Sequence, residues 1–127
     1  MPASYEIDKH RRLVLTTASG VLTLAEGLSH QEKLLADKDF DPAFSQLLDL
    51  TGITEMTIDS SGIRALAIRN IFSLGSRRAL LVSSELMFAF SRMFAMFRAL
   101  EGEHQIEIFR DRKEAMDWLS KCPKPLQ

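Results

Sequence analysis

The sequence predicts an α/β protein with a mixed sheet of four or five strands, backed by about four helices. After an N-terminal hairpin pattern, helix-type and strand-type patterns alternate to the end of the chain, which is typical of strands joined by crossover helices. The chain has 127 residues, 46% of them hydrophobic and 26% charged, as in proteins with one globular core. We therefore expect residues 1–127 to form a single domain.

The first half of the chain predicts a hairpin, a helix and a central strand. Residues 5–7 and 13–17 alternate as strands do, with a polar turn between them. Thr23 and Glu26 have the spacing of a capping box, which predicts a helix over residues 24–36. A short apolar run of Leu47, Leu48 and Leu50, interrupted only by Asp49, predicts a central strand that ends in a loop over residues 51–57.

The second half predicts two further strands and three helices. Strand patterns cover residues 79–82 and 106–109. Serine or aspartate, which are preferred N-cap residue types, precedes each helix pattern. The three helices are expected to begin at Ser60 or Ser61, at Ser83 or Ser84, and after Asp111, and the first two to end near Gly75 and at Leu100.

Charge and hydropathy argue against two classes of function. The chain has 16 Lys and Arg against 17 Asp and Glu, for a net charge of -1, whereas nucleic-acid binding needs many cations to neutralise phosphates. We expect no nucleic-acid partner. No apolar stretch approaches the roughly 18 residues of a membrane span, and the N-terminus lacks a signal-peptide pattern. We therefore expect a cytoplasmic protein.

No pattern in the sequence indicates catalysis, a metal or a cofactor. The three histidines, His10, His30 and His104, have no other ligand-type residue at metal-binding spacing. Phosphate-binding glycine loops and the Gly-x-Ser-x-Gly elbow are absent from the sequence. The single cysteine, Cys122, has no partner for a disulfide. The sequence therefore favours a non-enzymatic protein without a cofactor.

One pair of motifs indicates a site for a protein partner. Residues 49–54 read Asp-Leu-Thr-Gly-Ile-Thr, and residues 59–63 read Asp-Ser-Ser-Gly-Ile. Together they resemble the signature of the STAS domain found in anti-sigma factor antagonists. In those proteins the first serine of the second motif is phosphorylated, and the domain binds its partner only when unmodified. The resemblance implies that Ser60 is a phosphoacceptor, and that the partner-binding candidates are Asp49, Thr51, Asp59, Ser60, Ser61 and Gly62.

A structural role explains the same serines equally well. Ser60 or Ser61 can act as the N-cap of the following helix, a role that contributes about 1 kcal/mol to stability. A phosphate at a helix N-terminus is also physically favourable, because the helix dipole and free backbone N–H groups attract negative charge. The sequence leaves both roles open.

The rest of the chain resembles the SpoIIAA-like family of free-standing bacterial proteins. The resemblance rests on the N-terminal hairpin, the strand start at residues 77–80, a Met- and Phe-rich helix, and residues 108–119. It implies a STAS-like fold that is also similar to the lipid-carrying CRAL-TRIO domains. A role in contact with a lipophilic ligand or a membrane surface is suspected for this family.

The expected helix over residues 84–100 is the most apolar part of the chain. It holds four of the eight phenylalanines and three of the six methionines. Apolar positions cover about half of its circumference. One stripe consists of Leu86, Phe90, Met93, Phe97 and Leu100, and it is widened by Met87, Ala89, Phe94 and Met96. The helix either borders an apolar pocket, forms a homodimer contact, or simply lies deep in the core. The candidates for ligand or dimer contact are Met87, Phe90, Phe94, Met96 and Phe97, with Arg92 and Arg98 for anionic headgroups at a peripheral membrane contact.

These observations lead to two functional hypotheses. The first is a regulatory interaction module that binds a protein partner through residues 51–62. The alternative is a carrier or sensor of a lipophilic small molecule or membrane surface, which uses the helix over residues 84–100.

Overall fold

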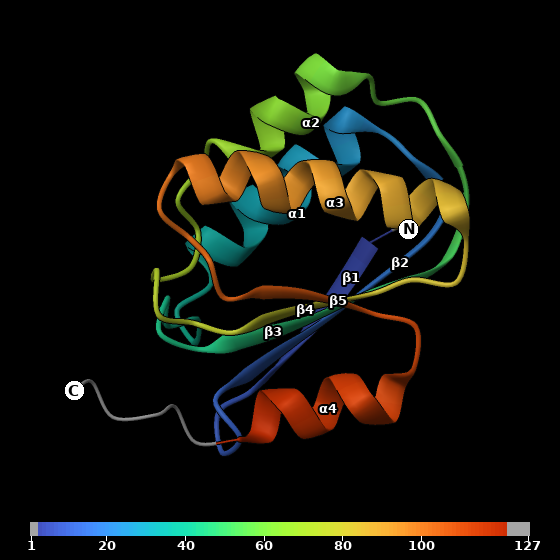
Figure 1. Ribbon diagram of the computed structural model, residues 1–127. Coiled ribbons are helices and arrows are strands. Elements are labelled where there is room, and N and C mark those ends of the chain that lie inside the picture. The colour runs from blue at the N-terminus through green and yellow to red at the C-terminus, as the bar shows by residue number, and fades with distance from the viewer. Residues whose placement is uncertain (1–2, 122–127) are drawn as a thin grey trace.

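The structure is a computed structural model that describes residues 3–121, and these form a five-stranded sheet with helices on both faces (Figure 1). The elements follow the predicted order. They are β1 (Ala3–Asp8), β2 (Leu13–Leu22), α1 (Leu24–Ala36), β3 (Ser45–Met56), α2 (Ser60–Ala67), β4 (Arg78–Leu81), α3 (Glu85–Leu100), β5 (Ile106–Phe109) and α4 (Arg112–Ser120). The predicted mixed sheet with four helices is therefore confirmed.

The strands lie side by side in their sequence order, β1-β2-β3-β4-β5. β1 and β2 form the antiparallel hairpin, and the remaining neighbours pair in parallel. Successive crossovers of the usual right-handed sense, all advancing in one direction across the sheet, place their helices on the same face. Figure 1 shows α1, α2 and α3 together on one face and α4 alone on the other.

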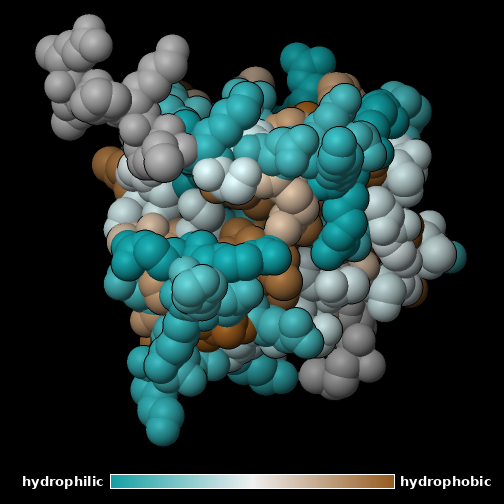
Figure 2. All heavy atoms as spheres, turned by 90° about the horizontal axis from the view of Figure 1, so that it is seen from below, coloured by the Kyte–Doolittle hydropathy of each residue, from teal (hydrophilic) through white to brown (hydrophobic). Residues whose placement is uncertain are grey.

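Each face of the sheet has its own apolar core. Side chains alternate along β3, so that Leu48 and Leu50 face α1–α3 while Leu47 faces α4. The larger core includes Phe90 and Phe94 of α3. Figure 2 views the molecule from the side of α4, and hydrophilic side chains cover most of this face, with hydrophobic atoms visible between them.

The predicted helix starts are largely confirmed. Thr23 accepts a hydrogen bond from the backbone N–H of Glu26 at 3.2 Å, Ser84 accepts one from Met87 at 3.1 Å, and Asp111 accepts one from Glu114 at 3.3 Å. α1 ends at Ala36 and α3 at Leu100, as predicted. Within residues 3–121, no helix is both long and apolar enough to cross a membrane. Cys122 lies outside the described residues.

The predicted loop over residues 51–57 is wrong, because β3 continues to Met56. β2 is also longer than expected, and its last residues pair with this extension, Leu22 with Met56. Gly52 permits the pairing, since a Cβ atom there would lie 3.0 Å from Cβ of Ser19. Such a contact between distant segments has no signal in the local sequence.

The predicted end of the second helix near Gly75 is also wrong. α2 ends at Ala67, with Ile68 as its C-cap. The apolar residues beyond it, Ile71 and Phe72, are buried in a smaller cluster with Leu34. Their spacing suggested a helix, whereas they enter the core from a non-helical connection to β4.

Candidate functional site

The start of α2 differs from the prediction in one respect that matters for Ser60. The N-cap is Asp59, whose Oδ1 accepts hydrogen bonds from the backbone N–H of Gly62 and from Oγ of Ser61, both at 2.9 Å. These two bonds hold the pKa of Asp59 below its ordinary value. Ser60 is the first residue of the helix and is exposed. The prediction that Ser60 or Ser61 is the N-cap is therefore wrong, because a charged acceptor occupies that position.

We expect Asp59→Ala to lower the urea midpoint of unfolding clearly, and Asp59→Asn to restore most of it, since asparagine is also a good N-cap. Ser60→Ala should change the free energy of unfolding by no more than about 0.5 kcal/mol, as is usual for exposed positions. Equilibrium urea unfolding followed by circular dichroism measures all three variants. A loss in Ser60→Ala as large as that in Asp59→Ala would contradict the assignment of the cap.

The first motif forms a second polar group, near the start of α4. Oδ1 of Asp49 accepts hydrogen bonds from the backbone N–H and from Oγ1 of Thr51, at 2.9 and 2.6 Å. Its Oδ2 accepts one from Nη1 of Arg112 at 3.1 Å. The strand between Thr51 and Met56 spans roughly 17 Å at the usual rise per residue. The partner-binding candidates therefore fall into two groups joined by the extension of β3.

The buried side of α3 agrees with the predicted stripe only in part. Phe90 of the stripe is buried, together with Met87 and Phe94, which were predicted to widen it, whereas Leu86 and Leu100 are 45% and 80% exposed. The apolar pattern was wide enough to allow more than one orientation of the helix, and packing against the sheet selected one. The predicted stripe is thus corrected at its two ends, Leu86 and Leu100.

The remaining ligand or dimer candidates on α3 lie in three environments. Met96 is 64% exposed, and Arg92 is exposed with its guanidinium 5.9 Å from the ring of Phe88. Phe97 is half-buried. Arg98 is fully buried, so the expectation that it meets an anionic headgroup is corrected, because no surface ligand reaches it.

A cavity of about 80 Å³, here called the interior cavity, lies between the sheet and helices α1–α3. Most of its wall is apolar, and Phe90 and Phe94 of α3 are part of it. Its polar lining residues are Thr16, Glu26, His30, Gln31, Gln46 and Arg78. A groove of about 260 Å³ between β1 and α1 shares Ala3, Glu26 and His30 with the cavity.

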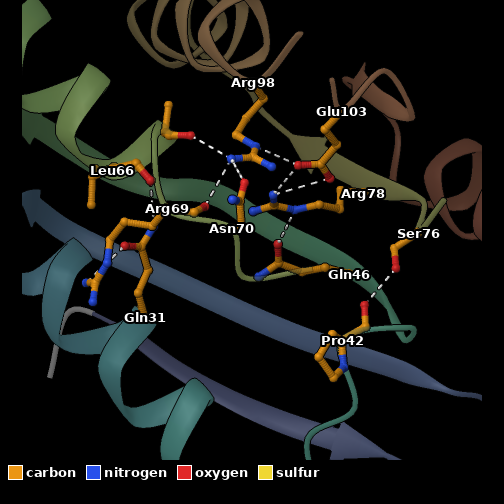
Figure 3. A network of polar contacts seen from close by, with 11 residues as sticks. Gln31, Pro42, Gln46, Leu66, Arg69, Asn70, Ser76, Arg78, Arg98 and Glu103 are labelled. Atoms are coloured by element: carbon orange, nitrogen blue, oxygen red, sulfur yellow. Dashed lines mark hydrogen bonds and ion pairs between the residues drawn. The ribbon is translucent and has the colours of Figure 1, made fainter. Parts of the chain in front are cut away.

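Three buried charges meet beside the interior cavity (Figure 3). Oε1 of Glu103 accepts from Nε of Arg98 at 2.7 Å and from Nη1 of Arg78 at 3.1 Å. Figure 3 shows both guanidinium groups converging on this one carboxylate. Nη1 of Arg98 also donates to the carbonyl oxygens of Ala67 and Arg69, at 2.8 and 3.1 Å, which satisfies carbonyls at the end of α2.

A line of polar contacts extends from these charges to His30. Nε of Arg78 donates to Gln46, and the amide of Gln46 donates to Oγ1 of Thr16 at 3.1 Å. Thr16 in turn lies 3.2 Å from Nε2 of His30. Burial, and then the positive charges of Arg78 and Lys33, lower the pKa of His30 to about 4. His30 is therefore neutral at pH 7.

The arrangement of the elements agrees with that of known structures. No family model and no curated protein matches the sequence. An uncharacterized protein of the DUF3478 family from Shewanella loihica PV-4, described as having a SpoIIAA-like fold, superposes with a TM-score of 0.62 at 21% identity, over 92% of this chain and 93% of that one. This chain has a SpoIIAA-like fold. An anti-sigma factor antagonist from Mycobacterium paratuberculosis superposes with a TM-score of 0.56 at 10% identity, over 94% and 95% of the two chains.

The SpoIIAA-like fold brings some of the predicted site residues together in space, and it also assembles residues that were not predicted. Asp59, Ser61 and Gly62 form one hydrogen-bonded group, and Asp49 and Thr51 another. Sequence reasoning missed the buried charges, because Glu103 follows a helix in a polar segment that gives no sign of burial. A basic residue at the start of the apolar strand β4 was the only signal at Arg78.

The described residues contain no group of three or more His, Cys, Asp and Glu side chains that could hold a metal ion. His30, although partly buried, faces Tyr5 in an edge-to-face contact and bonds to Thr16. In this SpoIIAA-like fold it belongs to the wall of the interior cavity.

Proposed function

We propose that this protein is a non-enzymatic regulatory module of the STAS type, and that it binds a protein partner through residues 51–62, with Ser60 as the phosphoacceptor. The observation that carries the proposal is that the side chain of Ser60 takes no part in capping α2. Its side chain is exposed at the first position of α2, while Asp59 performs the capping. Ser60 is therefore available to a kinase without loss of the helix cap.

The surface around Ser60 suits a partner. Between Thr51 and Ser61, only Ile53 and Ile58 are buried and Met56 is half-buried, so the exposed residues form one polar strip from the end of the sheet to the start of α2. The anti-sigma factor antagonist fold of one structural neighbour supports a protein as the occupant. The fold itself does not dictate this use, since one fold serves many functions.

A phosphate on Ser60 would change this surface for an electrostatic reason. It adds roughly two negative charges at pH 7 next to the carboxylate of Asp59. The helix dipole favours the new charge, but the backbone N–H of Gly62 and the hydroxyl of Ser61 are already bonded to Asp59. The phosphate therefore competes with the cap and changes the charge of the surface that meets the partner.

We expect incubation with an extract of the source cells and ATP to place phosphate on Ser60, as located by peptide mapping. Ser60→Ala should carry no phosphate there, whereas the matched control Ser61→Ala should be modified like the unaltered chain. A partner bound by the unmodified chain should be released after phosphorylation. Modification of Ser61 instead, or a partner that binds both forms equally, would refute the switch.

A second candidate function is the carriage of a lipophilic small molecule. Two observations favour it: Phe90 and Phe94 of α3 line the interior cavity, and Met96 and Leu100 leave an apolar strip on the outer side of the same helix. α3 therefore contributes both to an internal apolar space and to an apolar surface. Uptake of a ligand into the interior cavity is the property that tests this function.

A further inference from the structure

The buried charges beside the interior cavity are not balanced. Two guanidinium groups share the single carboxylate of Glu103, and arginine does not lose its proton in proteins. Arg78 is only 5% exposed and Glu103 1% exposed. Burial lowers the pKa of Arg78, and the opposing effect of Glu103 does not restore it. One excess positive charge is therefore held out of water, which is costly unless an anion accompanies it.

Some hydrogen-bond donors of the two arginines also have no acceptor in the protein. Within residues 3–121, Arg78 forms its hydrogen bonds through Nε and Nη1, which leaves Nη2 without a protein partner. Nη2 of Arg98 also lacks a partner and is fully buried. The guanidinium of Arg78 lies 4.7 Å from the ring centroid of Phe72 and 5.4 Å from that of Phe94, and both rings line the interior cavity. A free donor and an excess charge thus lie at the cavity wall.

The floor of the interior cavity is polar at one end and apolar at the other. Alternate residues of β2 and β3 form it, from Thr16 and Gln46 at the level of Arg78 to Ala18, Leu48 and Leu50 further along the two strands. A ligand with one charged end and a short apolar tail matches this gradient.

We propose that the interior cavity binds a short-chain monocarboxylate, whose carboxylate accepts hydrogen bonds from Arg78 and whose tail lies against Leu48 and Phe94. A volume of about 80 Å³ is roughly half that of an apolar cavity of about 150 Å³ that holds benzene, so the ligand has only about three or four non-hydrogen atoms. Arginine forms strong charge-assisted bonds with carboxylates. This proposal goes beyond the protein-interaction function. It rests on the carrier function only because both place a ligand in the interior cavity.

Other charged groups near the cavity do not supply the missing anion. Glu26 lines both the cavity and the groove between β1 and α1, but it forms no ion pair with Arg78. His30 is neutral at pH 7 because of its lowered pKa. The charge of Arg78 therefore stays available to a bound carboxylate.

Isothermal titration calorimetry at pH 7 of the full chain with straight-chain carboxylates from acetate to octanoate tests the proposal, with the primary alcohols of equal length as neutral probes. We expect acetate to bind and ethanol to bind roughly tenfold to a hundredfold more weakly, since a bond to a charged group is worth about 1.5–3 kcal/mol. Equal binding of acid and alcohol would overturn the carboxylate site while supporting the carrier function. Binding of neither probe would overturn the proposal.

Two variants locate the site. Arg78→Met removes the excess charge and leaves Arg98 paired with Glu103, so it should lose the preference for acetate over ethanol. The matched control Arg64→Met removes an exposed arginine of α2 and should bind like the unaltered chain. Ala18→Leu fills the cavity and keeps every charge, so it should abolish binding of both probes even if Arg78→Met fails to fold. Undiminished acetate binding by Ala18→Leu would place the ligand elsewhere and refute the proposal.

Discussion

Glu103→Gln should lower the free energy of unfolding by about 3–5 kcal/mol, which is the usual cost of leaving buried charges without their partner. Glutamine keeps the shape and an acceptor oxygen, but the guanidinium groups of Arg78 and Arg98 then face one another without a carboxylate. The contact with Arg98 is fully buried on both sides, so water cannot compensate. Urea unfolding followed by circular dichroism measures the loss.

The matched control is Glu101→Gln, two residues earlier in the chain. Glu101 is exposed at the C-terminus of α3, and its replacement should change stability by no more than about 0.5 kcal/mol. Similar effects of the two substitutions would mean that Glu103 in the buried cluster contributes no more to stability than a surface charge does. The same comparison in high salt should leave the loss in Glu103→Gln nearly unchanged, because buried pairs are little screened.

Phe94→Ala should lower the free energy of unfolding by about 3–5 kcal/mol, because it removes a large buried side chain and enlarges an existing cavity. Phe94 is 5% exposed and stacks on Phe90 with ring centroids 6.2 Å apart. It also lies against the guanidinium of Arg78, so its loss weakens the support of the buried cluster.

Met96→Ala on the outer side of the same helix provides the comparison. Met96 is 64% exposed, so its truncation should change stability by no more than about 0.5 kcal/mol. A large loss at Met96 together with a small one at Phe94 would mean that α3 is rotated about its axis relative to this structure. Thermal unfolding by calorimetry, with the two variants measured side by side, settles the comparison.

Much of the fold could be predicted because its signals are local. The hairpin turn after Asp8, the capping box at Thr23, and the caps at Ser84 and Asp111 each depend on residues within four positions of one another. The order of strands and helices follows from these signals together with the handedness of crossover connections. The end of strand β3 could not be predicted in this way, because its extension to Met56 exists only through pairing with β2.

The candidate site was predictable in part. The motifs at residues 49–54 and 59–63 identified the exposed strip and Ser60, and the structure leaves Ser60 free there. The sequence could not decide between Asp59 and the two serines as the cap, because aspartate and serine both cap helices well. It also could not show which side of α3 meets the sheet, since apolar residues cover half of that helix.

The sequence alone determined the order and ends of most elements, because hydrophobic periodicity and capping act over a few residues. Only the tertiary structure decided that Arg78, Arg98 and Glu103 share one buried cluster beside a cavity, although 25 positions separate Arg78 from Glu103. Burial of a charge depends on which distant segments surround it, and a residue such as Glu103 has the same local sequence whether it faces water or two arginines. The charge imbalance at the interior cavity is therefore a property of the folded chain.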